Sequence, residues 1–101
     1  MNSTTLLELW NQSLTQDKAA HALFLIATSE KDEYAGYTAI FAAIEGYEQA
    51  LISAKSARVL CGTHQGNLKK VNLLIKTISA NIRMIKKVAN GNASKQIEGN
   101  P

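Results

Sequence analysis

Small residues recur every three or four positions through the middle of the sequence, and this pattern constrains the fold more than any other. Such spacings place residues on one face of an α-helix, which has about 3.6 residues per turn. Small side chains on that face allow a second helix backbone to approach closely. We therefore predict a long, tightly packed helix over residues 32–61. The small row consists of Gly36, Ala39, Ala43, Gly46, Ala50, Ser53, Ala57 and Leu60.

A second row of larger apolar residues lies beside the small row on the same predicted helix. A helix with two adjacent apolar rows is buried on more than one side, so we expect it at the centre of a bundle. Gly62 is a natural end for this helix, because glycine readily adopts the left-handed conformation that closes helix C-termini. The larger row consists of Tyr37, Ile40, Ile44, Tyr47 and Leu51.

A third helical pattern follows a predicted turn at residues 62–67 and extends over residues 67–89. We expect its large residues to lie against the small row, because large side chains facing small ones interdigitate. Residues 32–61 and 67–89 would then form a long antiparallel hairpin whose first turns overhang the shorter third helix. The row of the third helix consists of Leu68, Val71, Ile75, Ile78, Ile82, Ile85 and Ala89.

The N-terminal segment is also helical in pattern. Thr5 and Glu8 have the spacing of a capping box. Residues 4–29 form either one bent helix or two shorter ones, and a strand over residues 23–28 is a minor alternative. The only proline is Pro101, so no internal proline interrupts these helices. We predict an all-α fold, a three- or four-helix bundle built on a long antiparallel helical hairpin.

Domain organisation and compartment follow from the remaining composition. We expect a bundle domain over residues 1–91 and a disordered tail over residues 92–101, which lack apolar periodicity. Cys61 is the only cysteine, so no internal disulfide forms, and a small secreted domain would usually need such bonds. The longest apolar run, residues 22–27, is far shorter than the roughly 20 residues that span a bilayer. We expect a cytoplasmic protein without metal or cofactor.

The charges are distributed unevenly along the chain. Residues 1–48 contain seven acids and two bases, whereas nine bases and no acid lie between Glu48 and Glu98. Four of these bases fall within about 40° on a helical wheel. They are either phosphate contacts or, as we favour, a solvated helix face, in part neutralised by a pairing of Arg83 with Glu45. The basic stripe consists of Lys69, Lys76, Arg83 and Lys87.

One segment carries a spacing that catalysis could use. Arg58 and His64 stand six positions apart in RVLCGTH. This spacing resembles the short signature of the HEPN ribonucleases, which are small all-α and often dimeric domains. The resemblance implies that Arg58 and His64 position phosphate and assist attack by the ribose hydroxyl. It covers this segment alone, and Val59 stands where that family usually has a polar residue.

No other motif indicates an ordinary enzyme, so we predict a non-enzymatic module that binds protein through helix faces. Adaptor, co-chaperone, inhibitor and immunity proteins of bacteria and phages share this general architecture. Aromatic residues are favoured at protein interfaces, and the candidates are Trp10, Tyr34, Tyr37 and Phe41. We expect a homodimer. The alternative is a nucleic-acid-binding protein that uses the basic stripe, and the third hypothesis is the HEPN-like ribonuclease.

Overall fold

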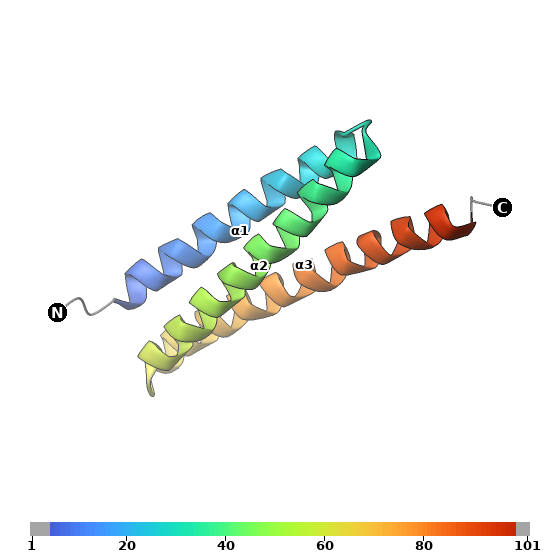
Figure 1. Ribbon diagram of the computed structural model, residues 1–101. Coiled ribbons are helices and arrows are strands. Elements are labelled where there is room, and N and C mark those ends of the chain that lie inside the picture. Colours follow the sequence, from blue (N-terminus) through green and yellow to red (C-terminus); the bar gives the residue numbers. More distant parts are fainter. Residues whose placement is uncertain (1–4, 99–101) are drawn as a thin grey trace.

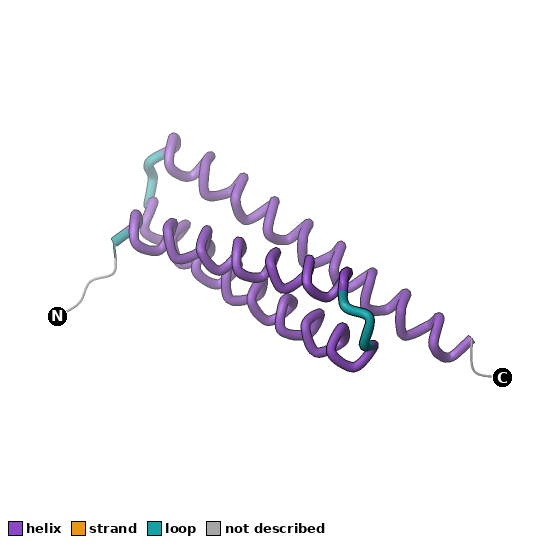
Figure 2. Tube along the Cα trace, turned by 90° about the horizontal axis from the view of Figure 1, so that it is seen from above, coloured by secondary structure: helices purple, strands orange, loops and turns teal. Residues whose placement is uncertain are grey.

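A computed structural model describes residues 5–98, with side chains described through residue 90, and shows three α-helices (Figure 1). They are α1, Leu6–Ser29, α2, Glu33–Cys61, and α3, Gln65–Glu98. The described residues contain no strand, so the predicted all-α bundle is confirmed and the strand alternative at residues 23–28 is wrong. Figures 1 and 2 show one elongated bundle, with the α1–α2 connector and the α2–α3 turn at opposite ends.

Helix α1 begins where the capping box is predicted. The hydroxyl of Thr5 accepts a hydrogen bond from the backbone N–H of Glu8 at 3.1 Å, and the Glu8 carboxylate accepts one from Thr5 at 3.3 Å. Two backbone donors that the helix leaves unpaired are thus satisfied. From this cap α1 continues without interruption to Ser29, so the N-terminal segment is one helix and not two.

Helix α2 has a defined start and stop. The Asp32 carboxylate accepts hydrogen bonds from the backbone N–H groups of Tyr34 at 2.9 Å and Ala35 at 3.4 Å, which caps the N-terminus. At the other end Gly62 adopts a φ of 55°, a backbone conformation that residues other than glycine rarely adopt. The predicted boundaries of this helix are therefore confirmed to within one residue.

The small row of α2 makes its closest contacts with α1, which corrects the predicted pairing with α3, although Ala57 at its end also packs with Val71 of α3. A Cβ placed on Gly46 would lie 3.0 Å from the Cβ of Ala20, and one placed on Gly36 would lie 3.6 Å from the carbonyl oxygen of Ala27. Two backbones approach this closely only when both helices carry small residues at the contact. Helix α1 supplies such residues, whereas the isoleucines of α3 would hold the backbones apart.

Two buried hydroxyls hydrogen-bond across the same contact. Ser13, which is fully buried, donates to the carbonyl oxygen of Ala50 at 2.8 Å. Ser53 donates to Oε1 of Gln16 at 2.7 Å. Because a buried hydroxyl without a partner is destabilising, these bonds fix the register of α1 on α2.

Helix α3 packs on the larger row of α2. Tyr47 lies fully buried in the core, and its hydroxyl is 3.4 Å from Nδ1 of His21 on α1. Contact between α1 and α3 is slight and includes a hydrogen bond from Asn81 to Asp17 at 3.3 Å. Helix α2 is thus the central helix, as predicted. The buried residues of the main core are Ala20, Ile40, Ala43, Tyr47, Ala50, Ala54, Leu74, Ile78, Ile82 and Ile85.

The register and length of α3 differ from those expected. Lys86 pairs with Glu48 at 3.4 Å, in place of the predicted pairing of Arg83 with Glu45. The helix also continues to Glu98, so the end predicted near Ala89 is wrong. Asparagine and glycine weaken a helix by only about 1 kcal/mol each, so residues 90–91 do not stop it. The domain boundary at residue 91 stays a prediction, and residues 99–101 of the expected tail lie outside the described residues.

The burial of Tyr47 predicts a loss of stability in alkali. Burial and then the nearby charge of Asp17 raise the pKa of Tyr47 above its ordinary value of 10.0. The Tyr47 hydroxyl therefore ionises at a lower pH in the unfolded chain than in the folded protein. Its contribution to stability is fully present below about pH 10 and is lost as the pH rises through the folded-state pKa. We expect Tyr47→Phe to lose less stability than the wild type between about pH 9 and pH 11 in denaturant titrations. Equal losses in the two proteins would contradict this.

Candidate protein-binding surfaces

The face of α2 that points away from the other two helices carries an exposed apolar row. We call it the outer row, and it consists of Tyr34, Phe41, Ile52 and Val59. These side chains are 82%, 64%, 57% and 78% exposed, respectively. On a helical wheel they fall within about 20° of one line, so they form a single ridge along nearly the whole helix.

The outer row adds a third apolar strip to α2, interrupted at its middle by the exposed Glu45 and Glu48. One side packs against α1, a second packs against α3, and the third is the outer row. The side of an amphipathic helix that faces solvent is normally polar, so large apolar residues there are unusual. Single exposed apolar residues are ordinary, but several large ones aligned on one helix face indicate a contact site. The outer row is therefore the leading candidate for the functional surface.

The structure separates the four predicted interface aromatics. Tyr34 and Phe41 lie in the outer row, whereas Tyr37 is half-buried. Trp10 is half-buried and packs against both core clusters. Sequence reasoning missed Ile52 and Val59, although their spacing of 11 and 18 residues from Phe41 places them on the same face.

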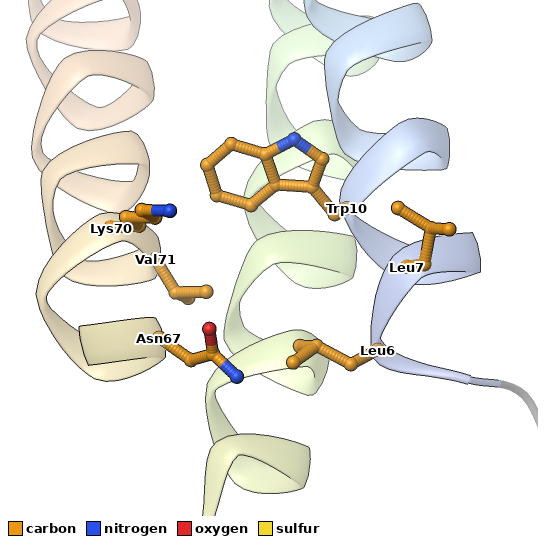
Figure 3. A pocket seen from close by; sticks show the side chains of 6 residues that line it. All are labelled: Leu6, Leu7, Trp10, Asn67, Lys70 and Val71. Atoms are coloured by element: carbon orange, nitrogen blue, oxygen red, sulfur yellow. The ribbon is translucent and has the colours of Figure 1, made fainter. Parts of the chain in front are cut away.

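Trp10 also lines a shallow groove between the N-terminal turns of α1 and α3. Figure 3 shows its indole pointing from α1 towards α3, with Lys70 and Val71 facing it. The groove encloses about 280 Å³. That volume is small for an enclosed ligand site. The lining residues are Leu6, Leu7, Trp10, Asn67, Lys70 and Val71.

A shorter apolar row lies on the outward face of α1. Leu7, Leu14 and Leu25 are 67%, 41% and 54% exposed, and they fall within about 20° of one line on a helical wheel. Like the outer row of α2, this row alternates with exposed polar residues, here Lys18 and His21. It is the natural comparison surface, because it has similar chemistry on a different helix.

The predicted basic stripe lies on solvated surface. Lys69, Lys76, Arg83 and Lys87 are all exposed, opposite the residues of α3 that face the core. Solvent therefore reaches each of these side chains. The exposed stripe remains able to contact phosphate.

We expect replacement of Lys69, Lys76 and Lys87 together by glutamine to leave the free energy of unfolding within about 0.5 kcal/mol of the wild type, because exposed charges contribute little to folding. Chemical denaturation measures this. A tight, salt-sensitive complex with duplex DNA or RNA that the triple variant loses would contradict the protein-binding assignment and favour nucleic acid instead.

Among the described contacts, none joins Arg58 to His64. His64 ends the α2–α3 turn, and its Nδ1 accepts a hydrogen bond from the backbone N–H of Asn67 at 3.1 Å. This bond caps α3, and the carbonyl oxygen of His64 accepts from Leu68 at 3.0 Å. Arg58 is exposed in the last turn of α2. The capping contact gives His64 a structural role that needs no catalysis.

Other classes of site find no support in the part of the chain that the structure describes. Within it, no group of three or more histidine, cysteine or acidic side chains could hold a metal ion. Cys61 is free and buried at the end of α2. None of the described helices combines the length and apolar character that crossing a membrane requires.

The chain matches no family model, no curated protein and no solved structure. Any proposal about the function of this chain therefore rests on its exposed surfaces.

Proposed function

We propose that this chain is a non-enzymatic helical module that binds a protein through the outer row of α2. The observation that carries the proposal is the exposure of four large apolar side chains in one line on the central helix. Adaptor, co-chaperone, inhibitor and immunity proteins act through surfaces of this kind. The buried, unpaired Cys61 suits the reducing cytoplasm, which we propose as its location.

The size of the outer row suits a contact that covers it entirely. Full burial of one large apolar side chain contributes about 1.5–3 kcal/mol. Association costs about 4–15 kcal/mol in lost freedom of the two bodies. Coverage of a single side chain would therefore not hold a complex, whereas coverage of all four contributes about 6–12 kcal/mol, comparable with that cost. Tyr34 and Phe41 supply the aromatic anchors that dominate many interfaces.

The other two hypotheses rank lower. The basic stripe of α3 is exposed, but α3 has no aromatic residue on which a base could stack. The ribonuclease hypothesis requires His64 to act on RNA, and in this fold its Nδ1 caps α3. The outer row is the surface that neither alternative uses.

We expect Phe41→Gln with Ile52→Gln to abolish binding and leave folding nearly intact. Both side chains are more than half exposed, so the free energy of unfolding should change by no more than about 1 kcal/mol. Binding is measured by expressing the tagged chain in cells and identifying the proteins that it captures. Further copies of this chain count among them. The double variant should lose the partner that the wild type captures.

The matched control is Leu7→Gln with Leu14→Gln, which changes two exposed leucines on α1. This control should capture the partner as the wild type does. If it loses the partner while the α2 double variant retains it, the binding surface lies on α1 and the proposal is wrong.

A further inference from the structure

The outer row of α2 is arranged symmetrically along the helix, and this symmetry bears on the identity of the partner. We propose that the partner is a second copy of this chain, with the two α2 helices packed antiparallel about a two-fold axis. The axis passes beside the midpoint between Gly46 and Tyr47. This inference rests on the proposed function, since it assumes that the outer row is the contact surface.

The register of the proposed dimer follows from the positions of the four apolar residues. Tyr34 and Val59 are equally distant from the midpoint, and so are Phe41 and Ile52. An antiparallel pair about that point therefore sets Tyr34 level with Val59 of the second copy, and Phe41 level with Ile52. Each contact joins an aromatic ring to a β-branched side chain, and each occurs twice.

The positions between these residues complete a two-helix seam. Eight exposed positions of α2 recur at alternating spacings of 4 and 3, the repeat that lets two helices pack along their length. The apolar residues lie towards both ends of the seam, Glu45 and Glu48 occupy its middle, and Lys55 lies between Ile52 and Val59. A two-fold contact is closed, so it does not generate a filament. The seam consists of Tyr34, Thr38, Phe41, Glu45, Glu48, Ile52, Lys55 and Val59, all exposed.

The charges at the two ends of the bundle favour the antiparallel arrangement. The α1–α2 connector holds two acids and one base, a net charge of −1, and they are Glu30, Lys31 and Asp32. The opposite end holds three bases and one acid, a net charge of +2, and they are Arg58, Lys69, Lys70 and Glu8. The ends are well separated (Figure 1). An antiparallel pair sets each acidic end beside a basic end, whereas a parallel pair sets like beside like.

The middle of the seam is acidic and opposes the contact. Glu45 comes level with Glu48 of the second copy, so four carboxylates approach the axis. Lys86 reduces this repulsion, because its ammonium lies 3.4 Å from the Glu48 carboxylate. We therefore expect Glu45→Gln to strengthen the dimer, lowering its Kd roughly two- to fivefold, as the loss of an exposed like-charge contact would. A foreign partner with a basic helix would instead bind this variant more weakly.

Disulfide trapping tests the register directly. In a Cys61→Ala background, one chain carries Phe41→Cys and a second carries Ile52→Cys. The mixture should form a disulfide-linked dimer under mild oxidation, because the two cysteines are level across the seam. Each variant alone should remain unlinked, since its cysteines would lie about 16 Å apart along the helices. A disulfide requires Cα atoms within roughly 4.4–6.8 Å.

Each other outcome overturns this inference. Linkage of Phe41→Cys with itself would indicate a parallel pair, and the absence of linkage in every mixture would exclude the seam. Circular dichroism verifies that the variants are folded, and light scattering of Glu45→Gln gives an independent answer without cysteines. If trapping fails while wild-type capture of another protein still depends on Phe41 and Ile52, the proposed function stands and only the second copy is excluded.

Discussion

Replacement of Tyr47 by alanine is expected to lower the free energy of unfolding by about 3–5 kcal/mol, the range for removing a fully buried aromatic side chain. Tyr47 is the largest fully buried side chain of the described residues, with 0% of its surface exposed. It belongs to the core cluster that joins all three helices, with Ala20 on α1 and Ile78 on α3. The cavity left by alanine would therefore weaken every helix contact at once. Urea unfolding followed by circular dichroism measures the change.

Tyr47→Phe is the matched control for this prediction. It keeps the ring and removes only the hydroxyl, whose distance of 3.4 Å from Nδ1 of His21 marks a weak hydrogen bond. We expect a loss of no more than about 1.5 kcal/mol. A loss below about 1 kcal/mol for Tyr47→Ala itself would show that the core does not depend on this side chain.

The second large effect is expected from Ala50→Leu, which should destabilise the protein by about 1–3 kcal/mol through overpacking. Ala50 is fully buried on the small row of α2, and its carbonyl oxygen accepts the hydrogen bond of Ser13 at 2.8 Å. A leucine there would push α1 away from α2 and lengthen that bond. Thermal unfolding by calorimetry measures the shift in Tm.

The control for Ala50→Leu is Ala42→Leu, a change of the same size one position off the small row. Ala42 is half-buried, so the added atoms can extend towards solvent. We expect its Tm to stay closer to that of the wild type. If Ala50→Leu unfolds at the wild-type temperature, the close contact between α1 and α2 is absent from the protein in solution.

Much of the fold could be predicted because the governing signals are local. The capping box at Thr5 and Glu8, the cap at Asp32 and the glycine stop at Gly62 all act within one helical turn. Periodicity likewise identifies the buried faces of α2 and α3 without any knowledge of their neighbours. These signals were sufficient for the helix class, the central place of α2 and most helix boundaries.

The pairing of the faces could not be predicted in the same way. Periodicity shows that the small row is buried, but not which helix covers it. Both α1 and α3 have a face that could cover the small row. Helix α1 makes the close contact, because Ser13, Ala20 and Ala27 bring its backbone close to α2. The length of α3 was missed for a different reason, since Asn90 and Gly91 are weak helix breakers that cost little.

The candidate surface was predicted in part. Tyr34 and Phe41 were expected at an interface from their residue type, and the structure shows both exposed. Ile52 and Val59 were missed, because an aliphatic residue in a mostly apolar helix gives no sign of its orientation until the buried faces are assigned. Once α1 and α3 occupy two faces of α2, the four residues align on the third.

Photo-crosslinking at position 41 tests most directly whether the outer row of α2 is a protein contact. Phe41 is replaced by the photoreactive amino acid p-benzoylphenylalanine, and Lys76 on the exposed face of α3 is replaced likewise as the control. On irradiation of cells that express the protein, we expect position 41 to join the 11.0 kDa chain to a second polypeptide, either another copy or a different protein. Position 76 should give no such product. An unlinked chain at position 41, or equal linkage at both positions, would contradict a binding role for the outer row.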